Sequence, residues 1–211
     1  MRLLLASGNA KKLAELQRIA TPLGVEVVQP QDIGGLPECV EDGVTFAANA
    51  AKKASEGARH SGLWTLADDS GLAVEALDGA PGVHSARYAG THGDDEANNA
   101  KLLRVLADVP EEDRDAAFVC ALALARPGDG EVTHQVTGRT FGRILHAPQG
   151  EGGFGYDPLF QFTEEGFAVT GLAFATLSAD EKSSLSHRGR ALRALEPALA
   201  ALLRGNSPGD N

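Results

Sequence analysis

Hydrophobic and polar positions along the first third of the chain follow two different periods, which predict alternating strands and helices. The apolar run at 3–6 predicts a short buried strand, and residues 25–28 predict another. Apolar side chains recur at helical spacing over 10–24 and again over 45–62, and both stretches end at a glycine, a common helix stop. This part of the chain is therefore expected to form two strands and two helices in alternation.

The middle of the chain begins as a strand and then becomes richer in β signals. Residues 63–67 predict a third strand, which the polar sequence at 68–71 is expected to close abruptly. A further helix is predicted over 93–109. The segments 116–125 and 131–142 are rich in strand-forming residues and are joined by the turn sequence RPGDG. They are expected to pair as an antiparallel hairpin.

The last quarter of the chain adds one strand and two helical segments. Residues 158–162 predict a short strand. Ser178 and Glu181 have the spacing of a capping box, which predicts a helix start. A final helix is predicted over 186–203, and Pro197 inside it is expected to produce a kink.

These elements predict an α/β fold built on a mixed twisted sheet. The pattern predicts one domain over 1–204, with a disordered tail over 205–211. In open sheets of this kind, ligands bind beyond the carboxyl ends of the strands. Two polar segments are expected at that edge, namely 7–12 after the first strand and 68–71 after the third.

Composition and charge exclude several classes of protein. With 211 residues, 43% of them hydrophobic, the chain can bury a sizeable core. A net charge of −10 repels nucleic-acid backbones, so nucleic acid is not expected as a partner. The apolar runs are too short for a signal peptide or a membrane span, so no membrane association is expected. Cys39 and Cys120 lack metal-ligand spacing and favour a reducing compartment, here the cytoplasm.

The sequence GEGGFGYDPLF (150–160) contains the pattern G-x-G-x-x-G. Pro158 disfavours helical geometry at Asp157, so no helix follows whose N-terminus could hold a pyrophosphate. A dinucleotide site is therefore excluded by context. Two interpretations stay open: Phe154 stacks on the face of a base, or Phe154 and Tyr156 pack inward in a tight loop.

The segment ASGNAKK follows the first predicted strand and opens the first helix. Ser7 and Asn9 can form side-chain hydrogen bonds, and the free amides of a helix N-terminus favour an anion. Lys12 adds a positive charge. Taken alone, an ordinary helix cap with surface lysines is the favoured interpretation, because the P-loop pattern is absent.

The segment ADDSG places two carboxylates side by side. Asp68 and Asp69 repel each other, so the pKa of one should rise unless a cation intervenes. Mg²⁺ is the natural cation, since it takes oxygen ligands and binds one or two carboxylates together with substrate phosphates. Glu41 is a candidate third carboxylate. The alternative is a turn with an aspartate cap, and the residues alone leave both interpretations open.

Basic residues gather in SADEKSSLSHRGRAL, within a chain that is otherwise acidic. Lys182, His187, Arg188 and Arg190 are a candidate anion clamp, and the alternative is a solvated helix face. Lys53, in the second predicted helix, is interpreted as solvated.

Four motifs occur in a distinctive order: SGNAKK, ADDSGLAVEALDGAPGVHSARYAG, GGFGYDPLF and LSADEKSSLSHRG. Together they resemble the HAM1-like noncanonical purine nucleoside triphosphate pyrophosphatases, also called XTP/dITP or inosine triphosphate pyrophosphatases. The resemblance extends from Leu3 to about Leu203. It implies a Mg²⁺-dependent hydrolase that releases pyrophosphate from ITP, dITP and XTP. It also implies a homodimer and a two-lobed single domain with a cleft between the lobes.

The resemblance also implies roles for individual residues. Asp69 matches the general base and a metal ligand, and Glu41 matches a second metal ligand. Asp68 is close enough in sequence to share either role. The positions that match substrate contacts fall in three groups: Ser7, Gly8, Asn9, Ala10, Lys11 and Lys12 for the triphosphate; Ser70; and Phe154, Gly155, Tyr156, Asp157, Lys182, His187 and Arg188 for the nucleotide pocket.

Hydrogen bonding suggests how such a pocket would select its base. Hypoxanthine and xanthine carry a 6-oxo acceptor and an N1–H donor, whereas adenine presents the reverse pattern. Asp157 facing N1–H, with Arg188 or a backbone amide facing O6, would fit the first pair. Two alternatives remain: a Maf-like nucleotide pyrophosphatase with other base specificity, and a nucleotide-binding sensor without catalysis.

Overall fold

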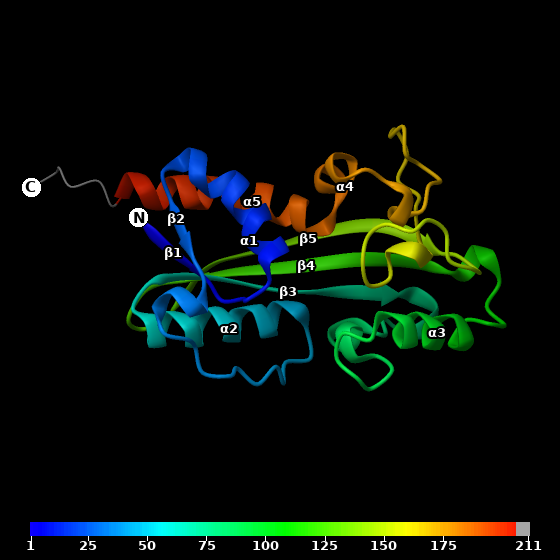
Figure 1. The fold of residues 1–211 in the computed structure, drawn as a ribbon, viewed down its shortest axis with the longest axis horizontal. Coiled ribbons are helices and arrows are strands. Elements are labelled where there is room, and N and C mark those ends of the chain that lie inside the picture. The colour runs from blue at the N-terminus through cyan, green and yellow to red at the C-terminus, as the bar shows by residue number, and fades with distance from the viewer. Residues whose placement is uncertain (206–211) are drawn as a thin grey trace, which may run out of the picture. The chain divides into compact units, whose positions relative to one another are not determined.

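The strands form one six-stranded sheet in the order β2-β1-β3-β4-β5-β6. The computed structural model describes residues 1–205 (Figure 1). The strands are β1 (Arg2–Leu5), β2 (Glu26–Val28), β3 (Trp64–Val74), β4 (Asp115–Ala125), β5 (Val132–Ile144) and β6 (Phe160–Phe162). The helices are α1 (Ala10–Ala20), α2 (Phe46–Ser61), α3 (Asp95–Val105), α4 (Ala179–Leu185) and α5 (His187–Gly205). β1 pairs in parallel with β2 and β3, and β5 pairs antiparallel with β6, so the predicted mixed sheet is confirmed.

Contacts divide the chain into two compact units. Of the described residues, unit 1 comprises Met1–Asp69, Ala121–Gly138 and 189–205, and unit 2 comprises Ser70–Cys120 and Arg139–Arg188. β1 and β2 belong to unit 1 and β6 to unit 2, whereas β3, β4 and β5 contribute residues to both.

Helix starts follow the capping residues that the sequence supplies. Asn9, Thr45, Asp94 and Ser178 precede α1, α2, α3 and α4, and each accepts a hydrogen bond from a first-turn backbone N–H. The capping box predicted at Ser178 is confirmed. The predicted helix and strand positions therefore hold to within a few residues, except in β3 and at the C-terminus.

Unit 1 has helices on both faces of its part of the sheet. α2 lies against one face, while α1 and α5 lie against the other (Figure 1). The α2 side is packed almost entirely with alanine: Ala50, Ala54 and Ala58 of α2 meet Ala67 of β3 and Ala121, Ala123 and Ala125 of β4. Small side chains let the helix approach the strands closely, and polar side chains of α2 come close to β3 as well.

Unit 2 is built around aromatic rings rather than alanines. Phe118 lies 4.4 Å from Phe160 and 5.9 Å from Phe174, measured between ring centroids. Leucines of α3 and α4 belong to the same buried cluster. Full burial of each such ring contributes roughly 1.5–3 kcal/mol. This cluster is the support for the loop at 150–157.

β3 does not close at the paired aspartates, so the predicted strand end is wrong. The strand continues through Asp68, Asp69, Ser70 and Gly71 to Val74. β1 ends at Leu5, paired with Leu66, but β4 remains beside β3 beyond that point. The carboxylates therefore lie past the end of β1 but inside β3, and consecutive side chains of a strand point to opposite faces.

The C-terminal helix runs further than predicted. Gly205, assigned from the sequence to a tail, is the last residue of α5, and the rest of that predicted tail, 206–211, lies outside the described residues. Pro197 lies within α5, and the predicted kink remains a prediction. None of the helices in residues 1–205 combines the length and apolarity needed to cross a bilayer.

Candidate active site

The loop between β1 and α1 is ordered by its own polar side chains. Asn9 Oδ1 accepts hydrogen bonds from the backbone N–H of Lys11 at 2.9 Å and of Lys12 at 3.3 Å. Ser7 Oγ accepts from Asn9 N at 3.2 Å, and Gln29 Nε2 donates to the Ser7 carbonyl at 3.0 Å. Gly8 and Ala10 complete the loop and the first residue of α1. The helix-cap interpretation is confirmed for Asn9, whereas anion binding by this loop stays a prediction.

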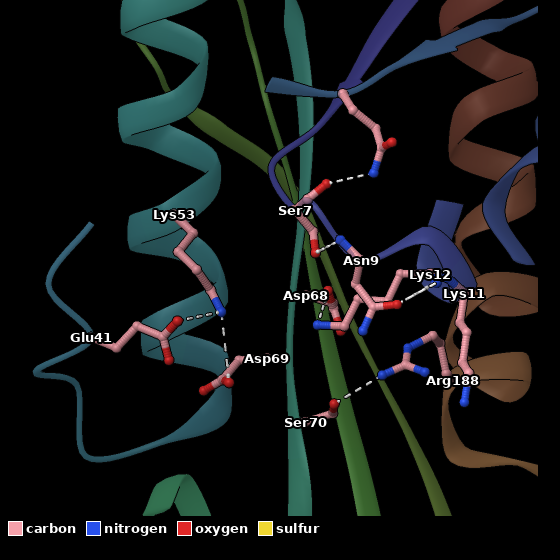
Figure 2. Close-up of polar contacts among 11 residues, drawn as sticks. Ser7, Asn9, Lys11, Lys12, Glu41, Lys53, Asp68, Asp69, Ser70 and Arg188 are labelled. Carbon is pink, nitrogen blue, oxygen red and sulfur yellow. Dashed lines mark hydrogen bonds and ion pairs between the residues drawn. The ribbon is translucent and has the colours of Figure 1, made fainter. Parts of the chain in front are cut away.

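Lys12 is not a surface lysine. Its Nζ lies 2.8 Å from Asp68 Oδ1, and the Asp68 residue is only 4% exposed (Figure 2). Because Lys12 comes from α1, Asp68 points to the face of the sheet that α1 covers. Asp68 thus holds the Lys12 ammonium group, which the sequence predicted as a positive charge for a ligand.

Asp69 points to the opposite face, toward α2. Asn49 Nδ2 donates to Asp69 Oδ2 at 3.0 Å, and Lys53 Nζ lies 3.7 Å from Asp69 Oδ1. The same Lys53 Nζ lies 3.0 Å from Glu41 Oε1, so one ammonium group stands between two carboxylates (Figure 2). Asn49 Oδ1 also accepts from Gly43 N at 2.8 Å, which ties the Glu41 loop to the same helix.

Lys53 and Asn49 are the residues that sequence reasoning missed here. The interpretation of Lys53 as solvated is wrong, since its side chain is 14% exposed and pairs with Glu41 and Asp69. A usable signal exists in the sequence: Asn49 and Lys53 are four residues apart, hence on one helix face, within a stretch that is otherwise mostly alanine. Polar side chains on an apolar helix face need a buried partner.

Electrostatics separate Asp69 from an ordinary carboxylate. Burial raises the pKa of Asp69, and the nearby charges of Glu41 and Asp68 act in the same direction. The Lys53 ammonium and the Asn49 hydrogen bond lower the pKa, but they do not outweigh burial. The pKa of Asp69 rises as expected for one member of the pair, but the main cause is burial and the charge of Asp68 contributes least. A raised pKa makes this carboxylate a better proton acceptor than an exposed aspartate.

The residues around Asp69 fit a divalent cation. Asp69 and Glu41 offer carboxylate oxygens, the ligand type that Mg²⁺ prefers, and they already share one positive charge in Lys53. Within residues 1–205, no group of three or more His, Cys, Asp or Glu side chains is arranged to hold a metal. A Mg²⁺ ion bound by one or two carboxylates commonly takes its remaining ligands from water and substrate phosphates, so two acids are sufficient.

A cavity of about 270 Å³ lies beside this group in unit 1. Ser7 and Gly8 of the β1–α1 loop line it, together with Glu41 and Lys53. The cavity thus lies next to the loop predicted to touch the triphosphate and next to Glu41, one of the two acids predicted to hold the metal, whereas Asp69 does not line it.

In unit 2, the glycine run packs against other backbone and against a carboxylate. Gly153 has φ +85°, and a Cβ there would lie 2.4 Å from Asp157 Oδ2 and 2.9 Å from Lys182 Nζ. The predicted absence of a following α-helix is confirmed, because Asp157–Leu159 form a short 3₁₀ turn. The glycines serve close packing around Asp157 and not a dinucleotide.

Phe154 and Tyr156 face in different directions. Tyr156 is 5% exposed, and its hydroxyl donates to the Ser85 carbonyl at 2.8 Å. Phe154 is 51% exposed, so the interpretation that both rings pack inward is wrong for Phe154. Lys182 Nζ lies 5.3 Å from the centroid of the Phe154 ring.

Three of the four basic residues of the predicted anion clamp are engaged within unit 2, whereas Arg190 belongs to unit 1. Lys182 pairs with Asp157, whose Oδ2 also accepts from Phe154 N at 2.8 Å. Arg188 is buried and donates to Ser70 Oγ at 3.1 Å (Figure 2). The His187 ring stacks on Phe118, with 5.1 Å between the ring centroids. The solvated-face alternative is therefore wrong for Lys182 and Arg188.

The structure brings the predicted residues together as two groups, one in each unit. Lys12, Asp68, Asp69, Glu41 and the loop from Ser7 form the group of unit 1. Asp157, Lys182 and Phe154 form a contact group in unit 2, with Gly155 between Phe154 and Tyr156. Ser70 and Arg188 make a separate contact in unit 2, and Ser70 follows Asp69 directly in the chain.

The sequence model of the Ham1 family matches residues 3–198, so the chain belongs to the Ham1 family. A dITP/XTP pyrophosphatase from Corynebacterium efficiens is 54% identical over 207 residues, which cover 96% of this chain and 99% of that protein.

Two solved structures carry the same fold. The HAM1 protein of Coxiella burnetii matches with a TM-score of 0.87 at 38% identity, covering 95% of this chain and 99% of that one. A nucleoside-triphosphatase, dITP/XTP pyrophosphatase, from Mycobacterium abscessus matches with a TM-score of 0.78 at 50% identity, covering 93% of this chain and 100% of that one.

Proposed function

We propose that this protein hydrolyses dITP, XTP and ITP to the monophosphate and pyrophosphate, and so removes deaminated purines from the nucleotide pool. Membership of the Ham1 family supports this, as does the high identity to proteins named dITP/XTP pyrophosphatases. The family match also favours this activity over the Maf-like alternative. The single structural observation that carries the proposal is the Asp69 carboxylate, buried against Lys53 and Asn49 with a raised pKa.

The residues of unit 1 are assigned to the triphosphate. Lys12, held by Asp68, and the loop from Ser7 to Lys11 bind phosphate oxygens. Asp69 orients a water molecule and accepts its proton as the water oxygen adds to phosphorus. The α–β phosphoanhydride bond breaks, and its bridging oxygen leaves on the pyrophosphate.

Mg²⁺ is part of the proposal as the cofactor. Asp69 and Glu41 would hold the ion, and it would neutralise phosphate charge that the chain alone leaves uncompensated. Lys53 places one positive charge between the two acids, which leaves one negative charge for the ion to balance.

The residues of unit 2 are assigned to the base. Phe154 offers an exposed ring for stacking on a purine. Within the described chain, both contacts of the Asp157 carboxylate use Oδ2, so Oδ1 is available to accept from N1–H of a 6-oxopurine. Lys182 or Arg188 donates to O6. Adenine would oppose donor to donor and acceptor to acceptor, and such sites discriminate by about 10⁴-fold.

Pyrophosphate release from a panel of dITP, XTP, ITP, dGTP and dATP tests the proposal. The 6-oxopurines without a 2-amino group should be turned over with the highest kcat/KM, and omission of Mg²⁺ should abolish release. Preference for dATP would contradict the assignment of Asp157. Tight binding of dITP without any turnover would instead favour the nucleotide-binding sensor.

A cytoplasmic location and a homodimer belong to the same proposal. Cys39 and Cys120 form no disulfide within residues 1–205, which suits a reducing compartment. The homodimer rests on the resemblance, and sedimentation of the purified chain measures it directly.

A further inference from the structure

Gly155 is held through both of its backbone groups by side chains of α3. Its N–H donates to Asp95 Oδ2 at 2.7 Å, and its carbonyl accepts from Asn99 Nδ2 at 2.9 Å. Asp95 and Asn99 are four residues apart and therefore share one face of the helix. Neither residue stands out in the sequence as part of a site. Their contact with the loop at 153–157 is visible only in the structure.

These bonds act where the chain passes from an exposed ring to a buried one. Gly155 separates Phe154, which is half exposed, from Tyr156, which is anchored by its bond to the Ser85 carbonyl. The preceding amide, Phe154 N–H, donates to Asp157 Oδ2 at 2.8 Å. Two consecutive amides are thus fixed by two carboxylates, one from the loop itself and one from α3.

α3 is itself firmly attached within unit 2. Asn98 Oδ1 accepts from Ala89 N at 2.7 Å, and Lys101 Nζ donates to the Tyr88 carbonyl at 2.6 Å. After the C-terminal end of α3, the buried Arg114 side chain donates to the Leu106, Val109 and Leu145 carbonyls. A side chain on such a helix holds its target more tightly than one on a loop.

Asn99 is not explained by stability alone. Its Oδ1 is buried and accepts no hydrogen bond from any residue in 1–205. A buried acceptor without a donor lowers stability, so an apolar side chain of similar size would suit this helix position better. The bond from Nδ2 to Gly155 is the one contact that an apolar residue could not make.

We propose that Asp95 and Asn99 are positioning residues that hold Gly155 and thereby fix the Phe154 ring and the Asp157 carboxylate for the purine base. The inference rests on the proposed function, since it assigns Phe154 and Asp157 to base recognition. It predicts that loosening Gly155 weakens nucleotide binding while the chemistry near Asp69 is unaffected.

Steady-state kinetics on dITP with Mg²⁺ test this with Asp95→Ala and Asn99→Leu. Each variant should raise KM by about 5–10-fold, the equivalent of one lost hydrogen bond, with kcat unchanged. Asp95→Asn keeps an acceptor oxygen and should restore KM toward the wild-type value. The matched control is Asp94→Ala, which removes the N-cap that accepts from Ala97 N and does not contact Gly155. It should lower Tm without raising KM.

Two outcomes would overturn the proposal. One is an unchanged KM in both Asp95→Ala and Asn99→Leu. The other is a rise in KM for Asp94→Ala equal to that for Asp95→Ala, which would trace the effect to helix stability.

Amide hydrogen exchange separates this inference from the proposed function, because it needs no substrate. The Gly155 N–H should exchange faster in Asp95→Ala than in wild type, and it should be unchanged in Asp94→Ala. If wild type releases no pyrophosphate from dITP, the proposed function has failed, and this exchange measurement alone decides the inference. Equal Gly155 exchange in wild type and Asp95→Ala would then overturn it.

Discussion

Asp68 and Asp69 are neighbours in one strand and are both buried, with 4% and 8% of their surface exposed, yet they lie in different surroundings. Asp68 faces α1 and is paired with Lys12 at 2.8 Å. Asp69 faces α2, where it shares Lys53 with Glu41, and burial raises its pKa. The difference follows from the alternation of a strand, which sends consecutive side chains to opposite faces. The first aspartate holds the Lys12 ammonium, and the second is the one that we propose as the proton acceptor.

The largest effect is expected for Asp69→Asn. Removal of the proton acceptor should lower kcat on dITP by about 10²–10⁴-fold. The variant should stay folded at pH 7. Because burial raises the folded-state pKa of Asp69, the charged carboxylate costs stability, and this cost develops as pH rises above the ordinary aspartate value of about 3.9.

Urea unfolding measured at several pH values tests whether ionised Asp69 lowers the stability of the folded protein. Asp69→Asn should be at least as stable as wild type at pH 7, and the difference should vanish below about pH 4, where both folded and unfolded wild type carry the proton. A variant that is clearly less stable at pH 7 would show that the Lys53 pair outweighs burial.

The matched change on the other face, Asp68→Asn, should act mainly on stability. It leaves the partly buried Lys12 ammonium without its carboxylate, and breaking a buried pair costs about 3–5 kcal/mol, reduced here to about 1–3 because Lys12 is 22% exposed. The loss of kcat should be smaller than for Asp69→Asn. Equal losses of kcat in the two variants would contradict the assignment of different roles to Asp68 and Asp69.

Asn49→Ala probes the α2 face more gently. It removes the buried hydrogen bond to Asp69 Oδ2 and the partly buried one from Gly43 N, and should cost about 1–2 kcal/mol of unfolding free energy. The pKa of Asp69 should rise further, because the Asn49 bond lowers it. Thermal unfolding measures the first effect, and an unchanged Tm would show that the loop at Gly43 is held by other contacts.

The smallest effect is expected for Lys53→Met, measured without nucleotide. The change keeps the apolar stem and removes the charge between Glu41 and Asp69, so stability in a chelator should fall by about 0.5–1.5 kcal/mol at pH 7. Added Mg²⁺ should raise Tm more in the variant than in wild type, since the two acids then depend on the metal. If Mg²⁺ raises the Tm of neither protein, the assignment of Glu41 and Asp69 as metal ligands is wrong.

Local sequence signals predicted most elements but not how polar groups are distributed around β3. Caps at Asn9, Thr45 and Ser178 mark helix starts directly, because they satisfy amides within one turn. The continuation of β3 through Asp68 and Asp69 depends on β4, which is about 50 residues away in the chain, and on cations supplied by α1 and α2. A pair of acids without those partners is typical of a turn, which is why the strand end was placed too early.

The same limit applies to the candidate site. The paired carboxylates and the exposed Phe154 could be singled out from their residue types. The roles of Lys53, Asn49, Asp95 and Asn99 could not, because each acts through a contact between elements distant in sequence. Only the spacing of four between Asn49 and Lys53, and likewise between Asp95 and Asn99, carries a local trace of these contacts.

Burial against α2 disfavours the negative charge of Asp69, and its proposed role as proton acceptor depends on this. Carbon-13 NMR of the Asp69 carboxyl, titrated in the nucleotide-free and metal-free protein, measures this directly. We expect a midpoint above the ordinary aspartate value of about 3.9. A midpoint at or below that value would mean that Lys53 and Asn49 outweigh burial, and Asp69 would then lack the property on which its proposed role depends.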